Sequence, residues 1–197
     1  MTRLHTPATT LRPFAALTLV CMLATPALAK VTEHEQHQGY PVHQAPGTSL
    51  RAALDSASPI RENGRIYHGN TAWDIRWSFR WDRNAMGWCQ ILGVATKLSV
   101  TITLPELKSG TAAGQAEFQK YIRALAFHEE GHKKIAQEAA YAADRAISTL
   151  PPMTSCKALA SEAQRQGNAI LDSARKAGVD YDATTQHGHT QGACLGC

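Results

Sequence analysis

The residues best suited to chemistry are two histidines four positions apart, in His128-Glu129-Glu130-Gly131-His132. On an α-helix, side chains with this spacing lie one above the other on the same face. Two imidazoles placed in this way can bind one Zn²⁺, with Glu129 beside the open position of the metal. There Glu129 could accept a proton from a water molecule that zinc has made acidic. The H-E-x-x-H pattern thus predicts Zn²⁺ as cofactor, His128 and His132 as metal ligands and Glu129 as the catalytic base.

A long helix is predicted around this motif, from about residue 111 to residue 150. The segment is rich in Ala, Glu, Gln and Lys and contains no proline. Apolar residues recur at spacings of three and four, and His128 and His132 fall on the same stripe. This placement favours a buried metal site over the alternative of a solvated His/Glu face. A second helix is predicted over residues 156–177, with Gly178 as its stop.

Two strands are predicted before the long helix. From Trp73 to Trp81, aromatic and apolar residues alternate with charged and polar ones. A second strand is expected over residues 88–104, where apolar residues again share parity, and Pro105 is expected to end it. The predicted fold is α+β and zincin-like, with a small antiparallel-rich sheet on the H-E-x-x-H helix and a second, C-terminal helix beside it.

The third zinc ligand is expected in the segment after the second helix. An antiparallel helix of about 21 residues spans about 31 Å, so its far end returns to the level of the His pair. The segment 181–192 that follows is dense in ligand-type residues. His187 is the preferred candidate, with His189 and Asp182 as alternatives. Tyr181 or His189 could also stabilise a developing oxyanion.

The first 29 residues are typical of a secretory signal peptide, with a basic start, an apolar core and an A-x-A ending. Cleavage after Ala29 would leave a soluble, periplasmic or secreted protein without a membrane span. Residues 30–45 are polar and His-rich, and we expect a flexible arm there. Residues 46–192 would form the catalytic domain and residues 193–197 a short C-x-x-C tail. Removal of the signal peptide lowers the formal net charge from +4 to +2, which argues against a nucleic-acid partner.

Four cysteines remain outside the signal peptide: Cys89, Cys156, Cys194 and Cys197. In an oxidising compartment we expect disulfides. Cys194 and Cys197 are so close in sequence that they most simply pair with each other or stay free. We therefore predict a disulfide between Cys89 and Cys156, which would enclose the whole metal-binding helix.

The H-E-x-x-H motif and the terminal pattern Tyr181-Asp182-x-x-Thr185-x-His187-Gly188-x-x-Gln191-Gly192 together resemble a bacterial family of predicted secreted zinc-dependent proteases. Gly69-Asn70-Thr71-x-Trp73 and Leu104-Pro105 fit the same resemblance, which covers roughly residues 40–192. Glu106-Leu107 departs from the aromatic residue typical of the family, and Cys194 and Cys197 look like additions. The resemblance implies the fold and the metal more firmly than the substrate.

Two functions are therefore expected. The first is an exported zinc metallopeptidase acting on a peptide or protein, with peptidoglycan peptides among the candidate substrates. The second is a non-catalytic periplasmic metal-binding or assembly protein that keeps the zinc site. Three protein ligands with an open position would favour the enzyme, and four protein ligands would favour the binding protein.

Overall fold

The computed structural model describes residues 31–196. The predicted signal peptide and Cys197 lie outside the described residues. Within this range the fold is α+β, with one three-stranded sheet, one short hairpin and three α-helices. The elements in chain order are β1 (Val31–His43), α1 (Leu50–Ala57), β2 (Arg61–Glu62), β3 (Arg65–Ile66), β4 (Asn70–Arg83), β5 (Cys89–Ser109), α2 (Ala112–Ser148), α3 (Cys156–Thr185) and the short 3₁₀ helix η1 (His189–Gln191).

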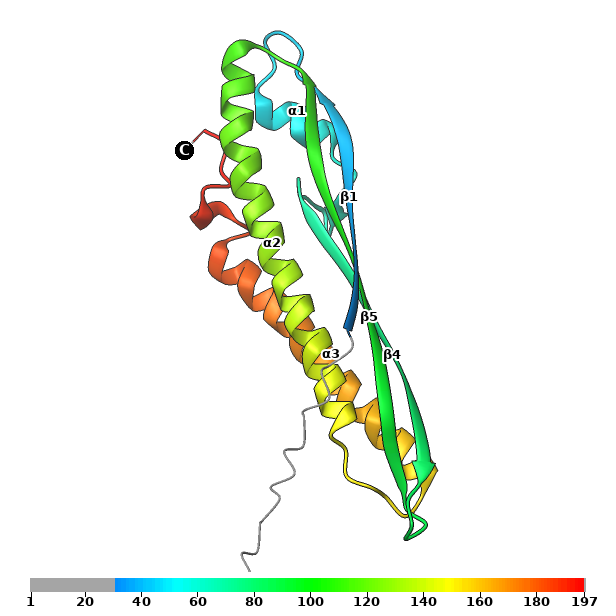
Figure 1. Ribbon diagram of the computed structural model, residues 1–197. Helices are drawn as coiled ribbons and strands as arrows, with labels where there is room; N and C mark the ends of the chain where they lie inside the picture. The colour runs from blue at the N-terminus through cyan, green and yellow to red at the C-terminus, as the bar shows by residue number, and fades with distance from the viewer. Residues whose placement is uncertain (1–30, 197) are drawn as a thin grey trace, which may run out of the picture.

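The sheet is long and narrow, and α2 and α3 run along one face of it (Figure 1). Its strand order is β1-β5-β4, with β4 antiparallel and β1 parallel to the central β5. The sheet is therefore mixed, where we expected it to be antiparallel-rich. No helix among residues 31–196 is both long enough and apolar enough to span a membrane.

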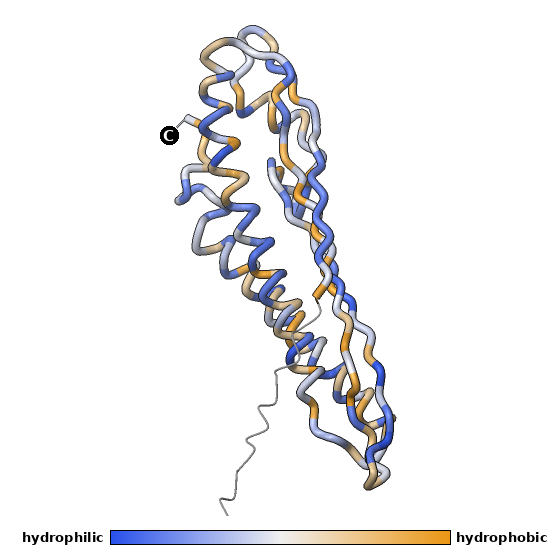
Figure 2. Tube along the Cα trace, viewed as in Figure 1, coloured by the Kyte–Doolittle hydropathy of each residue, from blue (hydrophilic) through white to orange (hydrophobic). Residues whose placement is uncertain are grey.

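The predicted alternation in β4 is confirmed. Ile75 is buried and Trp73 and Trp77 are half-buried on the inner face, while the intervening residues are exposed. Figure 2 shows such changes of hydropathy from residue to residue along the strands. A β-bulge next to Arg80 disturbs the pattern near the end of the hairpin. Beyond it, Trp81 is 47% exposed and Leu92 is 53% exposed, although we expected both on the buried face.

The expectation of a flexible arm over residues 30–45 is wrong, because Val31–His43 is a strand that pairs along its whole length with β5. Its side chains are mostly exposed, and only Tyr40 and Val42 are buried. The strand is thus held mainly by main-chain hydrogen bonds, which depend little on side-chain type. The sequence of this segment shows no apolar alternation, because most side chains on both faces of this edge strand are exposed.

The expectation that Pro105 ends the second strand is also wrong, since β5 continues to Ser109. The last residue of β5 that pairs with β4 is Thr103, opposite Asn70. Beyond Thr103 the strand has a partner only on the β1 side. A proline is tolerated where one side of a strand is unpaired, because its missing N–H breaks no ladder hydrogen bond there.

The two predicted long helices are present and antiparallel, and the second is longer than expected (Figure 1). Thr111 caps α2 by accepting a hydrogen bond from the Gly114 N–H, and Ser155 caps α3 in the same way. The end of α3 is Thr185, so Gly178 lies inside the helix and does not stop it. A glycine within a helix costs only about 1 kcal/mol, which packing of the helix can offset.

One core cluster lies between α1, β1 and the N-terminal half of α2, and another lies where the C-terminal half of α2 meets the sheet. Ala136, Ala139 and Ala140 pack there against Leu98 and Ile102, and all five are buried. Small alanines allow the helix to approach the strands closely. At the same end of the molecule, the predicted disulfide between Cys89 and Cys156 is confirmed, and it joins β5 to the start of α3.

Candidate functional site

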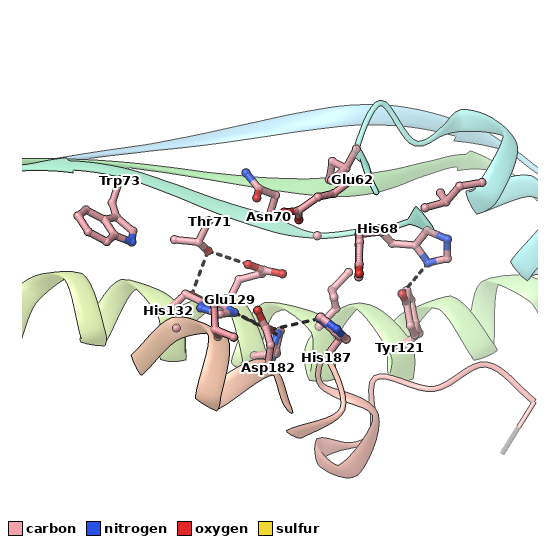
Figure 3. A pocket seen from close by; sticks show the side chains of 18 of the residues that line it. Glu62, His68, Asn70, Thr71, Trp73, Tyr121, Glu129, His132, Asp182 and His187 are labelled. Carbon is pink, nitrogen blue, oxygen red and sulfur yellow. Dashed lines mark hydrogen bonds and ion pairs between the residues drawn. The ribbon is translucent and has the colours of Figure 1, made fainter. Parts of the chain in front are cut away.

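A cleft of about 590 Å³ lies beside the middle of α2. The start of β4 and the β2–β3 hairpin line one side, and α2 and the end of α3 line the other (Figure 3). The H-E-x-x-H residues reach this cleft because they lie on the buried stripe of α2. Among the residues that line the cleft are Thr71, His128, Glu129, His132, Asp182 and His187.

Two histidines and one carboxylate converge at one point of the cleft. Asp182 Oδ1 lies 3.1 Å from His128 Nε2 and 3.0 Å from His132 Nε2. The two imidazole Nε2 atoms lie 3.3 Å from each other. These three residues are a group whose ligand atoms all lie within 4.8 Å of one another, the spacing expected around a single metal ion. The sequence prediction named His187 as third ligand, whereas the structure brings Asp182 to this position.

The donor set fits zinc in both chemistry and spacing. Two histidines and one carboxylate are a known ligand set of catalytic zinc sites. Donor atoms at about 2.0–2.1 Å from a tetrahedral zinc ion lie about 3.3 Å apart. The three separations measured here are close to that value. His128, His132 and Asp182 could therefore hold one zinc ion with little rearrangement.

Groups behind His128 fix the orientation of its ring. The Nδ1–H donates to Gln191 Oε1 at 3.0 Å, while Gln191 Nε2 donates to the Tyr181 hydroxyl at 3.0 Å. This arrangement directs Nε2 of His128 toward His132 and Asp182, and metal-binding histidines commonly have such a partner on the second nitrogen. The Tyr181 ring stacks on His128, with centroids 5.0 Å apart.

Tyr181 lies behind the metal-binding group, and the structure does not support the oxyanion role that we expected for it. Its hydroxyl donates to the backbone oxygen of His128 and does not line the cleft. Gly131 makes this packing possible, because a Cβ there would overlap the Tyr181 hydroxyl. His189, the other residue expected in that role, is exposed and also does not line the cleft.

Glu129 is buried, and its carboxylate faces the cleft (Figure 3). The Thr71 hydroxyl on β4 donates to Glu129 Oε2 at 2.8 Å. Burial raises the pKa of Glu129, although the hydrogen bond from Thr71 opposes the shift. A raised pKa brings a carboxylate closer to the range in which it can both take up and release protons near neutral pH.

The end of α3 brings Asp182 and His187 to the cleft in different ways. Asp182 is on the last turn of the helix, and its half-buried carboxylate points at the His pair. His187 follows the helix with a positive φ of 52°, and its side chain is 45% exposed. Its Nδ1 lies 3.4 Å from Asp182 Oδ1, and its ring is tilted against Tyr67. His187 thus lies at the edge of the metal-binding group.

A second polar network closes the far end of the cleft, and we did not foresee it from the sequence. Buried His68 contacts the Tyr121 hydroxyl through Nδ1 and the Asp55 carboxylate through Nε2, both at 2.7 Å. The Tyr40 hydroxyl also donates to the His68 backbone oxygen. These bonds join α1, β1, α2 and the approach to β4, and they fix the wall of the cleft. Burial raises the pKa of Tyr40 to about 12, which keeps its hydroxyl protonated.

Sequence reasoning also missed the contacts that Thr71 makes with Glu129 and that Gln191 makes with His128. Both residues belong to the patterns that carry the family resemblance, Gly69-Asn70-Thr71 and the terminal Gln191-Gly192. A hydroxyl or an amide far from the His pair in sequence gives no sign of its spatial neighbour. Their position inside shared patterns was the one available signal.

One of three comparisons with known proteins finds a match. The comparison with curated proteins finds no match, and neither does the comparison with solved structures. A family model described as "Bacterial protein of unknown function (DUF922)" matches residues 37–188. This range is about three quarters of the chain and contains His128, Glu129, His132, Asp182 and His187. The chain belongs to this bacterial family.

Proposed function

We propose that the protein is an exported, zinc-dependent peptidase of the H-E-x-x-H type, with a zincin-like arrangement of sheet edge and active-site helix. The observation that carries this proposal is the convergence of His128 Nε2, His132 Nε2 and Asp182 Oδ1, with the Glu129 carboxylate in the same cleft. His128, His132 and Asp182 would hold the ion. Bound Zn²⁺ supplies a Lewis acid that lowers the pKa of water and polarises a carbonyl group.

Glu129 performs the proton transfers in this proposal. Its carboxylate takes a proton from the attacking water and then delivers that proton to the nitrogen of the departing amine. Burial favours the protonated form that exists between these two steps, and it therefore assists the first transfer, in which Glu129 takes up the proton. His128 and His132 keep their positions through the cycle because Gln191, Tyr181 and the α2 helix fix them.

The sheet offers a binding surface for an extended peptide. β4 is an edge strand, and its first residues line the cleft beside Glu129. A peptide that adds to this edge would receive main-chain hydrogen bonds and would lie across the His pair. Export is part of the proposal because a disulfide links β5 to α3, as is usual in oxidising compartments.

Peptide hydrolysis with and without a chelator tests this function. We expect the wild-type protein to cleave a mixed peptide library, to lose activity with chelator and to recover it with zinc. Glu129→Gln should lower kcat by about 10²- to 10⁴-fold, since it removes the proton acceptor and keeps the size of the side chain. Glu138→Gln, at another glutamate of α2, serves as the matched control and should retain activity. Wild-type activity that survives in Glu129→Gln would refute the assigned role.

One observation favours a second function, that of a non-catalytic zinc-binding protein. His187 Nδ1 lies 3.4 Å from Asp182 Oδ1, so a small movement of the segment after α3 could make it a fourth ligand. A site closed by four protein ligands is typical of structural zinc. X-ray absorption of the zinc-loaded protein would count the histidines. Two histidines support the peptidase, and three support the binding protein.

A further inference from the structure

On the β4 side of Glu129, the neighbouring residues either contact its carboxylate or leave space for it. The Thr71 hydroxyl lies 2.8 Å from Glu129 Oε2 and 3.1 Å from the Glu129 backbone oxygen. One hydroxyl of the sheet thus contacts both the side chain and the main chain of the same helical residue. Because Thr71 is the second residue of β4, this contact fixes the distance between the sheet edge and α2 beside the cleft.

The other carboxylate oxygen of Glu129 occupies space that Gly69 leaves open. A Cβ at Gly69 would overlap Oε1 of Glu129 and would lie 3.0 Å from Leu125 Cδ1. Gly69 does not have a positive φ, so its backbone conformation does not itself require glycine. The need for glycine at this position arises from the carboxylate next to it.

We propose that Gly69 and Thr71 form a clamp that positions the Glu129 carboxylate for proton transfer, with Thr71 binding Oε2 and Gly69 making room for Oε1. This inference rests on the proposed function, in which Glu129 is the base. Neither residue belongs to the His128, His132 and Asp182 group, and the hydrogen bonds of Thr71 are to Glu129, whereas those of Gln191 are to His128 and Tyr181. The clamp therefore controls the base separately from the metal.

The first test compares Thr71→Val with Thr71→Ser. Valine keeps the shape of threonine but has no hydroxyl, whereas serine keeps the hydroxyl. We expect Thr71→Val to lower kcat by about 10- to 100-fold, since a catalytic group displaced by about 1 Å loses that much. KM and zinc affinity should stay within about threefold, and Thr71→Ser should retain most of the activity. Thr96→Val, which removes a threonine hydroxyl from another acid on α2, is the matched control and should keep wild-type kcat.

The second test uses Gly69→Ala. The overlapping Oε1 is at the end of a flexible side chain, so the protein should fold and move the carboxylate away. We expect a loss of kcat similar to that of Thr71→Val, and a crystal structure should show the Glu129 carboxylate displaced. Gly93→Ala is the matched control, because beyond the neighbouring residues of the chain a Cβ at this strand glycine would have the Arg80 side chain, at 3.7 Å, as its nearest contact.

A readout without catalysis separates the clamp from the proposed function. In chelator-treated protein, Thr71→Val should lower the unfolding temperature by more in the wild-type background than in Glu129→Ala. Equal shifts in the two backgrounds would overturn the clamp. If the wild type cleaves no peptide but this coupling is present, the clamp stands and the peptidase proposal fails. If the wild type is active and Thr71→Val keeps full kcat, the clamp fails and the peptidase proposal stands.

Discussion

The same kind of contact occurs in two regions of α2, with different surroundings. Thr96 on β5 donates to Asp144 at 2.9 Å, and Thr71 on β4 donates to Glu129 at 2.8 Å. Thr96, Asp144 and Glu129 are buried, whereas Thr71 is half-buried. Asp144 lies in the part of α2 where alanines pack on the sheet, while Glu129 lines the cleft.

This difference shows how one helix serves two purposes. Near Asp144, small side chains bring the helix against the strands, and the acid is fully enclosed. Near Glu129, the start of β4, the β2–β3 hairpin and the end of α3 line a cleft beside the helix. In the first region the threonine and the buried acid join the sheet to the helix. In the second region the acid of a similar pair lines the cleft.

The largest expected effect concerns the end of the molecule where the alanines of α2 pack on the sheet and the disulfide joins β5 to α3. Replacing Cys89 and Cys156 by serine should lower the free energy of unfolding by about 2–5 kcal/mol, because the bridge restricts a long loop of the unfolded chain. The sequence separation of the two cysteines is 67 residues. Chemical denaturation of oxidised and variant protein measures the change. A loss of less than about 1 kcal/mol would show that packing alone holds this end together.

A smaller effect is expected for Thr96→Val. The substitution leaves the Asp144 carboxylate buried without its hydroxyl partner, which should cost about 1–3 kcal/mol of stability. Thr71→Val should cost less, since Glu129 lines the cleft and can turn toward the solvent there once the hydroxyl is gone. Parallel denaturation curves of the two variants test this order. A larger loss for Thr71→Val would mean that both pairs are structural cross-links.

The pH dependence of the metal-free protein should be the mildest effect. Burial alone would lower the pKa of His128, but hydrogen bonds to Asp182 and Gln191 raise it. Burial would raise the pKa of Asp182, but hydrogen bonds from His128 and His132 lower it. The Asp182 contribution to stability is thus present above about pH 3.9 and is lost as pH falls below that value. The His128 contribution is present below about pH 6.5 and is lost as pH rises through its raised pKa.

Chelator-treated protein should therefore be most stabilised by this pair between about pH 4 and 6.5, with an unfolding temperature that falls toward pH 8. Asp182→Asn should reduce that fall, because it removes the partner that raises the pKa of His128. Differential scanning fluorimetry of both proteins from pH 4 to pH 8 measures these unfolding temperatures. An unfolding temperature that rises from pH 6 to 8 in the metal-free wild type would contradict the assignment.

Several features of the fold followed from the sequence because they depend on local periodicity. The alternation from Trp73 to Trp77 and the apolar stripe of α2 identified a strand and a helix and the faces that they bury. The pairing of Cys89 with Cys156 followed from the proximity of the other two cysteines. β1 could not be recognised, because a mostly exposed edge strand needs no apolar pattern.

The site was predictable only where its residues are neighbours in sequence. His128, Glu129 and His132 lie within about one helix turn, so the sequence alone predicted that they share a site. The third member of the group depended on where α3 ends, and Gly178 suggested an end at residue 177, eight residues too early. The helix continues to Thr185, and Asp182 therefore reaches the His pair from its last turn. Thr71 meets Glu129 only through the packing of β4 on α2, which no local pattern encodes.

Zinc binding by single-residue variants tests the central claim most directly. Competition with a chromophoric chelator gives the stoichiometry and the affinity for the wild type, His132→Ala, Asp182→Ala and His187→Ala. We expect one zinc ion per wild-type chain, with a loss of about 100-fold or more in affinity for His132→Ala and Asp182→Ala and less than about tenfold for His187→Ala. A wild-type protein that binds no zinc, or a His187→Ala variant that loses as much affinity as Asp182→Ala, would contradict this assignment.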